Sequence, residues 1–131
     1  CELVKKFIKE KSAIGDLEND FLTPLKSSFQ DLEEALKFFL ENGIKNPNSA
    51  LAGASDFLHL LGTFCTGFMW AKMIASLLEN KYSSEASKNF KHAKIITGKF
   101  YMENILPKTS YLVTKIKAGD KTIMSLEKDQ F

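Results

Sequence analysis

Few side chains in this sequence are of the types that perform acid–base, nucleophilic or metal chemistry. The two histidines, His59 and His92, lie in different predicted helices. Asp56 precedes His59 with the spacing that places both side chains on one face of a helix. A di-iron helical bundle needs Glu-x-x-His on two helices and two further carboxylates. This single partial match therefore indicates an ordinary surface pair of Asp56 and His59, and we predict no metal site.

Nucleophilic and phosphate-binding motifs are also missing from the sequence. It contains no glycine-rich phosphate loop, no Gly-x-Ser-x-Gly and no His-Glu-x-x-His. Cys65 lies in an apolar segment without a neighbouring Lys or His to activate its thiol, so we interpret it as a small core residue. Trp70 and Tyr101 are interpreted as aromatic residues at the edge of the core. We therefore predict no catalytic, cofactor-binding or metal-ligating residue in the chain.

The charge pattern argues against a nucleic-acid-binding protein. Eighteen basic and sixteen acidic residues give a net charge of +2, and every basic residue is lysine. Arginine, the residue suited to bidentate contacts with phosphate and guanine, does not occur. Lys88, Lys91, Lys94 and Lys99 project within a sector of about 140° of one predicted helix. This face is either a solvated surface or a dock for a phosphate group or an acidic protein surface.

The elements that must position these residues are four helices. Helix signals predict segments over 2–14, over 23–42 with Thr23 as N-cap, from Asn48 or Ser49 to about 80, and from Ser84 to 118. Pro107 should kink or split the last helix near residue 104, and Gly43 and Gly119 should end the second and fourth helices. Heptad-like spacing predicts two core-facing sets of residues: Leu25, Phe29, Leu32, Leu36 and Phe39, and Ala86, Phe90, Ala93, Thr97 and Phe100. The predicted fold is all-α, an up-down four-helix bundle with two long helices and a short C-terminal tail.

The segment from Phe57 to Leu78 is apolar enough to require a membrane test. Its longest uncharged run, Phe57 to Ala71, has 15 residues and spans about 22 Å as a helix, short of the ~30 Å hydrocarbon core. We therefore predict a central buried helix and no membrane span. Gly62 and Gly67 in this segment indicate either the close crossing of a neighbouring helix or a gap for a ligand.

Two runs from the third predicted helix onward, with the chain's last residues, resemble a known family. ALAGASDFLHLLGTFCTGFMWAKMIASLL (50–78), NFKHAKIITGKFYMENILP (89–107) and the ending AGDKTIMSLEKDQF (118–131) resemble the C-terminal helical domain of acyl-CoA dehydrogenases. The resemblance is to the subgroup similar to 3-methylmercaptopropionyl-CoA dehydrogenase. Before residue 43 only the amphipathic pattern and LEEALKFFLENG agree.

This resemblance implies that residues 1–131 are a single helical domain, a C-terminal fragment of a cytoplasmic flavoprotein oxidoreductase of fatty acid metabolism. FAD, acyl-CoA and the catalytic glutamate would belong to upstream domains of the parent enzyme, so the fragment alone would hold no cofactor and no activity. Its partners would be those upstream dehydrogenase domains and a second copy in a homo-oligomer, not nucleic acid.

Two other functions remain open at this point. A stand-alone bundle could bind a protein partner, or an apolar ligand near Gly62, Gly67 and Pro107. A secreted signalling bundle could use a disulfide between Cys1 and Cys65.

Overall fold

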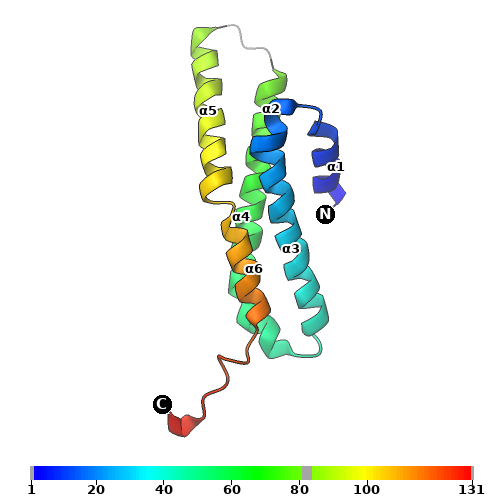
Figure 1. Ribbon diagram of the computed structural model, residues 1–131, viewed down its shortest axis with the longest axis vertical. Helices are drawn as coiled ribbons and strands as arrows, with labels where there is room; N and C mark the ends of the chain where they lie inside the picture. The colour runs from blue at the N-terminus through cyan, green and yellow to red at the C-terminus, as the bar shows by residue number, and fades with distance from the viewer. Residues whose placement is uncertain (1, 81–83, 131) are drawn as a thin grey trace.

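Helices make up all the regular secondary structure in the part of the chain that the structure, a computed structural model, describes: residues 2–80 and 84–130. Figure 1 shows α1 (Glu2–Lys11) and α4 (Pro47–Glu79) running opposite to α3 (Thr23–Asn42), α5 (Glu85–Asn104) and α6 (Lys108–Ala118). Three short elements complete the order: α2 (Gly15–Leu17), the π-helix η1 (Glu18–Leu22) and the 3₁₀-helix η2 (Lys128–Gln130). The predicted all-α architecture of four packed helices is confirmed.

Local signals in the last predicted helix are also confirmed. The Ser84 hydroxyl accepts a hydrogen bond from the Ser87 backbone N–H and begins α5. Pro107 lies at the junction where α5 ends and α6 begins, because it has no N–H to continue the helical ladder. Gly119 ends α6 with φ of 66°, a conformation that glycine adopts without steric cost.

The start of α3 differs from the prediction. Thr23 does not cap a new helix, because η1 runs into α3 without a break and Leu22 is already in the right-handed helical conformation. Pro24 is tolerated one residue after this wider π turn, where the missing N–H and the bulky ring would otherwise disturb an α-helix. Gly43 ends α3, but with a right-handed φ of −57° rather than a left-handed one.

Two further helix ends differ as well. The first helix ends at Lys11, before the predicted Ile14. Asn46, not Asn48 or Ser49, precedes α4 as its N-cap residue. The Ser49 side chain instead contacts Asp120 at the end of α6, so a long-range contact has taken the place of a local cap.

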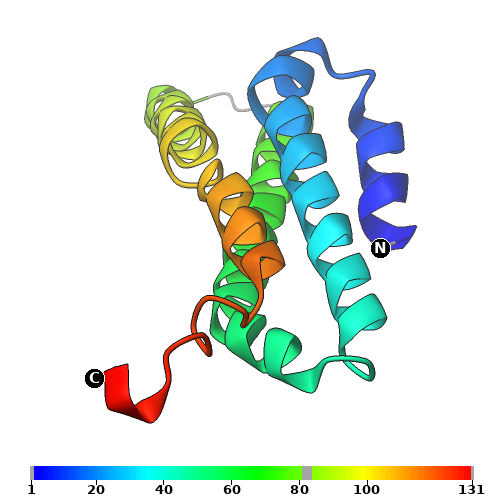
Figure 2. The ribbon, with the colours of Figure 1, turned by 60° about the horizontal axis from the view of Figure 1, so that its bottom comes forward.

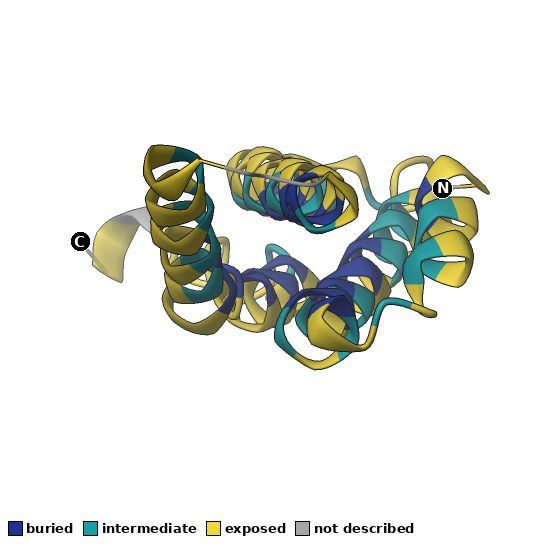
Figure 3. Cartoon of the chain, turned by 90° about the horizontal axis from the view of Figure 1, so that it is seen from above, coloured by how far each residue is buried: buried dark blue, intermediate teal, exposed yellow. Residues whose placement is uncertain are grey.

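The core lies between α4 and the arc formed by the other helices. Seen along the bundle, α4 lies on one side, and α5, α6, α3 and α1 follow one another around the other side (Figure 3). α4 faces this core with Gly53, Leu60, Gly67 and Ile74, one buried residue every seven. Figure 2 shows α1 beside α3, and the tail leaving the bundle after α6. The rest of the core comes mainly from Leu17, Phe21, Leu22, Leu25, Phe29, Leu32, Met102, Leu106, Leu112, Val113 and Ile116.

The predicted inner face of the fourth helix was wrong over α5. Ala86, Phe90, Ala93, Thr97 and Phe100 are all exposed, and α5 instead buries Gly98 and Met102. A side chain at position 98 would meet the Phe21 ring at 2.8 Å, so the glycine allows α5 to approach η1 closely. A prediction from apolar periodicity selects the face with the large phenylalanines. It overlooks the face with Gly98, where the missing side chain lets α5 pack closely against η1.

α4 is the one helix in the described part of the chain that is long and apolar enough to cross a membrane, by length and composition. One side of it is part of the core described above. The absence of a membrane span stays a prediction.

Candidate functional site

The side chains capable of chemistry do not gather in one place. Asp56 pairs with Lys115 of α6, Nζ to Oδ1 at 2.9 Å, so the predicted pair with His59 was wrong. His59 and His92 are exposed on separate helices. Cys65 is exposed too, which overturns its interpretation as a core residue. Within residues 2–80 and 84–130 no group of three His, Cys, Asp or Glu side chains could hold a metal ion.

The lysine-rich sector of α5 is largely engaged within the chain. Lys99 Nζ lies 2.6 Å from Asp20 Oδ2 of η1, and this hydrogen bond, with the charge of the carboxylate, raises the pKa of Lys99. Lys91, Lys94 and Lys99 are half-buried, and Lys94 lies over an aromatic ring of its own helix at 5.5 Å. Lys88 is more exposed and forms an ion pair within α5 at 3.5 Å. Because Lys88 and Lys99 are paired with carboxylates of the chain, the sector favours a structural role over the docking of an anion.

Two polar clusters attach α6 to the rest of the bundle. At its start, Thr109 Oγ1 donates to Asp31 Oδ2 of α3 at 2.7 Å, and Ser110 Oγ donates to the same oxygen at 3.2 Å. Beyond its end, the Ser49 hydroxyl and the Asn46 amide donate to the Asp120 carboxylate. The hydrogen bond from Ser49 is the main reason that the pKa of Asp120 is lowered. These contacts fix both ends of α6 and engage the carboxylates of Asp31 and Asp120.

The aromatic residues at the edge of the core also have structural roles. Tyr101 is half-buried, as predicted for a residue at the edge of the core, and its hydroxyl donates to the Thr63 carbonyl at 3.0 Å. Burial raises the pKa of this phenol. Trp70 is half-buried as well, which confirms its predicted place.

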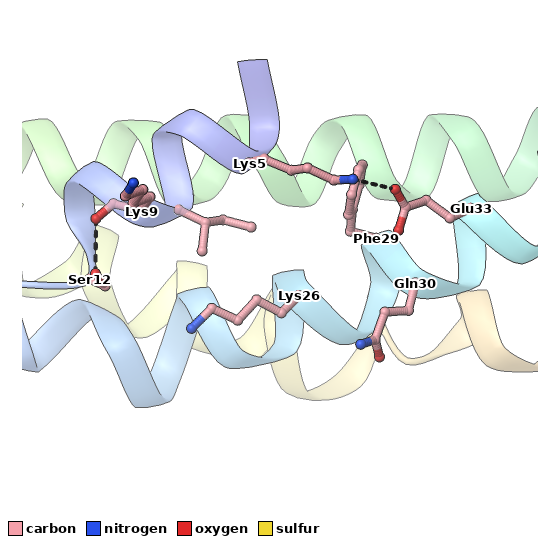
Figure 4. A pocket seen from close by; sticks show the side chains of 8 residues that line it. Lys5, Lys9, Ser12, Lys26, Phe29, Gln30 and Glu33 are labelled. Carbon is pink, nitrogen blue, oxygen red and sulfur yellow. Dashed lines mark hydrogen bonds and ion pairs between the residues drawn. The ribbon is translucent and has the colours of Figure 1, made fainter. Parts of the chain in front are cut away.

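A shallow polar groove of about 380 Å³ separates α1 from α3 (Figure 4). Lys5 Nζ bonds Glu33 Oε1 at 2.9 Å and lies 5.6 Å from the centre of the Phe29 ring. Lys26 is also in an ion pair, with Glu18 of η1. The groove therefore presents ion pairs that join two helices, and it resembles a helix contact more than a ligand site.

An apolar groove of about 450 Å³ lies between α1, α3 and α4. Its lining carries no polar side chain: Val4, Phe29, Leu32, Leu36, Phe57, Leu61 and Phe64. The ligand gap predicted near Gly62, Gly67 and Pro107 is not in this place. A side chain at Gly67 would meet Leu106 at 2.8 Å, which confirms close packing there, whereas Gly62 has nothing within 4 Å and no helix crosses it.

The surface of α4 opposite its buried side is apolar. We define the outer strip of α4 as the residues that recur on this side at alternating spacings of four and three, and all are exposed: Leu51, Ser55, Leu58, Gly62, Cys65, Met69, Lys72 and Ser76. Sequence reasoning missed this strip because α4 is apolar on both sides, and apolar periodicity alone does not show which side is covered.

Comparison with known proteins identifies the family. The family described as acetyl-CoA dehydrogenase C-terminal like matches residues 1–127. The chain belongs to this family. No curated protein matches the chain. The acyl-CoA dehydrogenase C-terminal-like domain is thus a helical domain, in agreement with the bundle described above.

Full-length dehydrogenases of this family are linked to FAD, so the grooves of this C-terminal-like domain were tested for a fit to that cofactor. A dinucleotide needs hydrogen-bond donors for its pyrophosphate, supplied by backbone N–H groups or cationic side chains. The apolar groove offers no polar side chain, and two of the three lysines that line the polar groove, Lys5 and Lys26, are paired with carboxylates of the chain. The described residues do not fit FAD, and no chemical step through FAD is derived for them.

Proposed function

We propose that this chain is the C-terminal helical domain of an FAD-dependent acyl-CoA dehydrogenase, and that its own role is structural. The match of the family to residues 1–127 is the observation that supports this proposal. According to this proposal, the parent enzyme carries out α,β-dehydrogenation of an acyl-CoA thioester, and FAD and substrate bind in its upstream domains. The finer assignment, to the subgroup similar to 3-methylmercaptopropionyl-CoA dehydrogenase in the cytoplasm, rests on the segments 50–78 and 89–107.

The physical character of the domain supports a packing role. Several of its charged side chains form ion pairs between helices, such as Asp56 with Lys115 and Asp20 with Lys99. Its outer surface carries large apolar side chains, including Phe90 and Phe100 of α5, which are 54% and 57% exposed. Contiguous apolar surface on a soluble domain marks an interaction site more often than an accident. We infer that upstream dehydrogenase domains cover part of this surface.

Two experiments test this proposal: the first determines the coding sequence before the codon for Cys1, and the second removes this domain from the encoded enzyme. A dehydrogenase body encoded directly before the codon for Cys1 is the expected result, whereas a native start codon there would overturn the assignment. Removing residues 1–131 from the parent should lower its thermal stability or change its oligomeric state. A truncated parent with full activity, unchanged assembly and unchanged stability would refute the packing role.

A second candidate function is supported by the apolar groove between α1, α3 and α4. Its volume of about 450 Å³ and its wholly apolar lining suit a small apolar ligand. In this reading the chain binds an acyl chain or a similar molecule without chemistry. Leu61→Glu places a charge at the rim of the groove, and it should abolish the binding of a fluorescent fatty acid if this function is correct. Equal binding by the wild type and the variant would exclude it.

A further inference from the structure

We propose that a second copy of this chain packs against the outer strip of α4, with the two α4 helices antiparallel about a twofold axis. The proposal goes beyond the function proposed above and does not rest on it, because it concerns the 131-residue chain alone. It assigns a partner to a surface that the fold leaves open.

The outer strip exposes large apolar side chains to solvent, which is unusual for the surface of a helix. Leu51 is 72% exposed, Leu58 68% and Met69 58%, whereas Leu60 and Ile74 on the opposite side are fully buried. A helix with one side in water normally carries charged residues on that side. Here the strip carries its single charge, Lys72, close to one end. Both sides of α4 therefore have the character of packed surfaces.

The order of side-chain sizes is symmetric over the four middle positions of the strip, Leu58, Gly62, Cys65 and Met69. The two smallest central residues, Gly62 and Cys65, are flanked by the larger Leu58 and Met69. When two such helices lie antiparallel, Leu58 faces Met69 of the partner subunit and Gly62 faces Cys65 of the partner subunit. A twofold interface requires this kind of self-complementary surface. The small residues at the centre allow the helices to approach closely, and the larger ones fill the space on each side.

Charge decides between the antiparallel and parallel arrangements. A parallel pair would place the two Lys72 ammonium groups opposite each other, which is unfavourable. The antiparallel pair places each Lys72 opposite the uncharged Ser55 of the partner subunit. No other Lys, Asp, Glu or His occupies a position of the strip. The antiparallel pair therefore buries no like-charged contact.

The strip is also accessible and large enough for a weak dimer. Figure 3 shows the other helices on one side of α4 and exposed residues along its opposite side. From Leu51 to Ser76 a helix extends about 38 Å, and one third of its perimeter over that length presents roughly 500 Å². Two copies would bury about 1,000 Å², the lower limit for a specific interface. An interface of this size is expected to hold a weak dimer.

Cys65 provides a direct test of this geometry. At an interaxial distance of about 8 Å, the two Cys65 Cα atoms of the antiparallel pair would lie roughly 6 Å apart, within the range of a disulfide. In a Cys1→Ser background, mild oxidation should convert the chain to a disulfide-linked dimer through Cys65. The cross-linked fraction should rise with protein concentration and disappear after Cys65→Ser.

Sedimentation equilibrium on charged and enlarged variants completes the test. The apparent mass of the wild type should rise above the 14.8 kDa of one chain. Leu58→Glu and Gly62→Leu should each raise the dissociation constant of the dimer at least about tenfold. Leu40→Glu is the matched control, because Leu40 is 82% exposed on α3, outside the strip. Circular dichroism checks that each variant is folded, and Gly62→Leu introduces a side chain into open space within the monomer.

Each alternative outcome would overturn the proposal. A monomer at every concentration, or a dimer that Leu58→Glu and Gly62→Leu leave unchanged, would mean that the strip is not the interface. Binding of the strip to anionic lipid vesicles or to a purified dehydrogenase body, with no self-association, would assign it to another partner. Because the assay needs no upstream domain, its failure leaves the proposed function untouched.

Discussion

The same substitution at two glycines should have different effects on stability. Gly62 and Gly98 both lie inside long helices, and replacing glycine by alanine in a helix interior gains about 1 kcal/mol. At Gly62 an added Cβ has nothing within 4 Å, so Gly62→Ala should stabilise the chain by that amount. At Gly98 the Cβ would lie 2.8 Å from Cε1 of Phe21 and 3.3 Å from Cγ1 of Ile74.

The cost at Gly98 follows from the packing of those neighbours. Phe21 and Ile74 are almost fully buried, so neither can move away without disturbing the core. Overpacking of this kind costs about 1–3 kcal/mol, which offsets the gain in helix propensity and leaves Gly98→Ala neutral to destabilising by about 2 kcal/mol. The two variants should therefore differ by about 1–3 kcal/mol.

Thermal unfolding followed by far-UV circular dichroism measures the difference. For a chain of this length 1 kcal/mol corresponds to a shift in Tm of about 3–4 °C. The experiment is done at low protein concentration, where contacts between copies do not contribute. A rise in Tm for Gly98→Ala equal to that for Gly62→Ala would refute the reasoning. Adding Phe21→Leu should relieve the Gly98→Ala penalty if the ring causes it.

Three further predictions concern the polar contacts. Asp31→Ala removes the acceptor of two hydroxyl groups at the start of α6 and should cost about 1–2 kcal/mol in urea unfolding, whereas Asp31→Asn, which keeps an acceptor, should cost less. The lowered pKa of Asp120 stabilises the fold above about pH 4, and this contribution is lost as the pH falls through that lowered pKa, so Asp120→Asn should lower the urea midpoint at pH 7 and do so less and less as the pH falls below about 4. The raised pKa of Tyr101 means that ionisation opposes folding above about pH 10, so Tyr101→Phe should lose less stability than the wild type between pH 7 and about pH 11. An equal loss in both proteins would contradict that reasoning.

Local chemistry in the sequence predicted the elements well. The Ser84 cap, the break at Pro107 and the stop at Gly119 each depend on one residue and its neighbours, and all three are present. The start of α3 was mistaken because a π turn joins it to the preceding segment. A continuous helix through Thr23-Pro24 depends on that wider turn, which a local pattern does not reveal.

The rotation of a helix about its own axis was harder to predict. α5 has apolar residues on two faces, and the choice between them depends on Gly98 fitting against Phe21, a contact between residues far apart in the sequence. α4 presents the same difficulty, and Cys65 was therefore placed inside when it lies outside. Periodicity shows that a face is apolar, but tertiary contacts decide what covers it.

The π turn of η1 has a consequence for how this chain tolerates insertions and deletions. A π turn is one residue added to an α-helix, and here it separates α1 and α2 from the long run of α3. Deleting one residue such as Asn19 would restore regular α-helical winding and rotate everything before it by about 100° relative to α3. Leu17 and Val4 would then turn away from the core. A single-codon change in this turn would thus re-aim the whole N-terminal segment, while α3 to α6 kept their places.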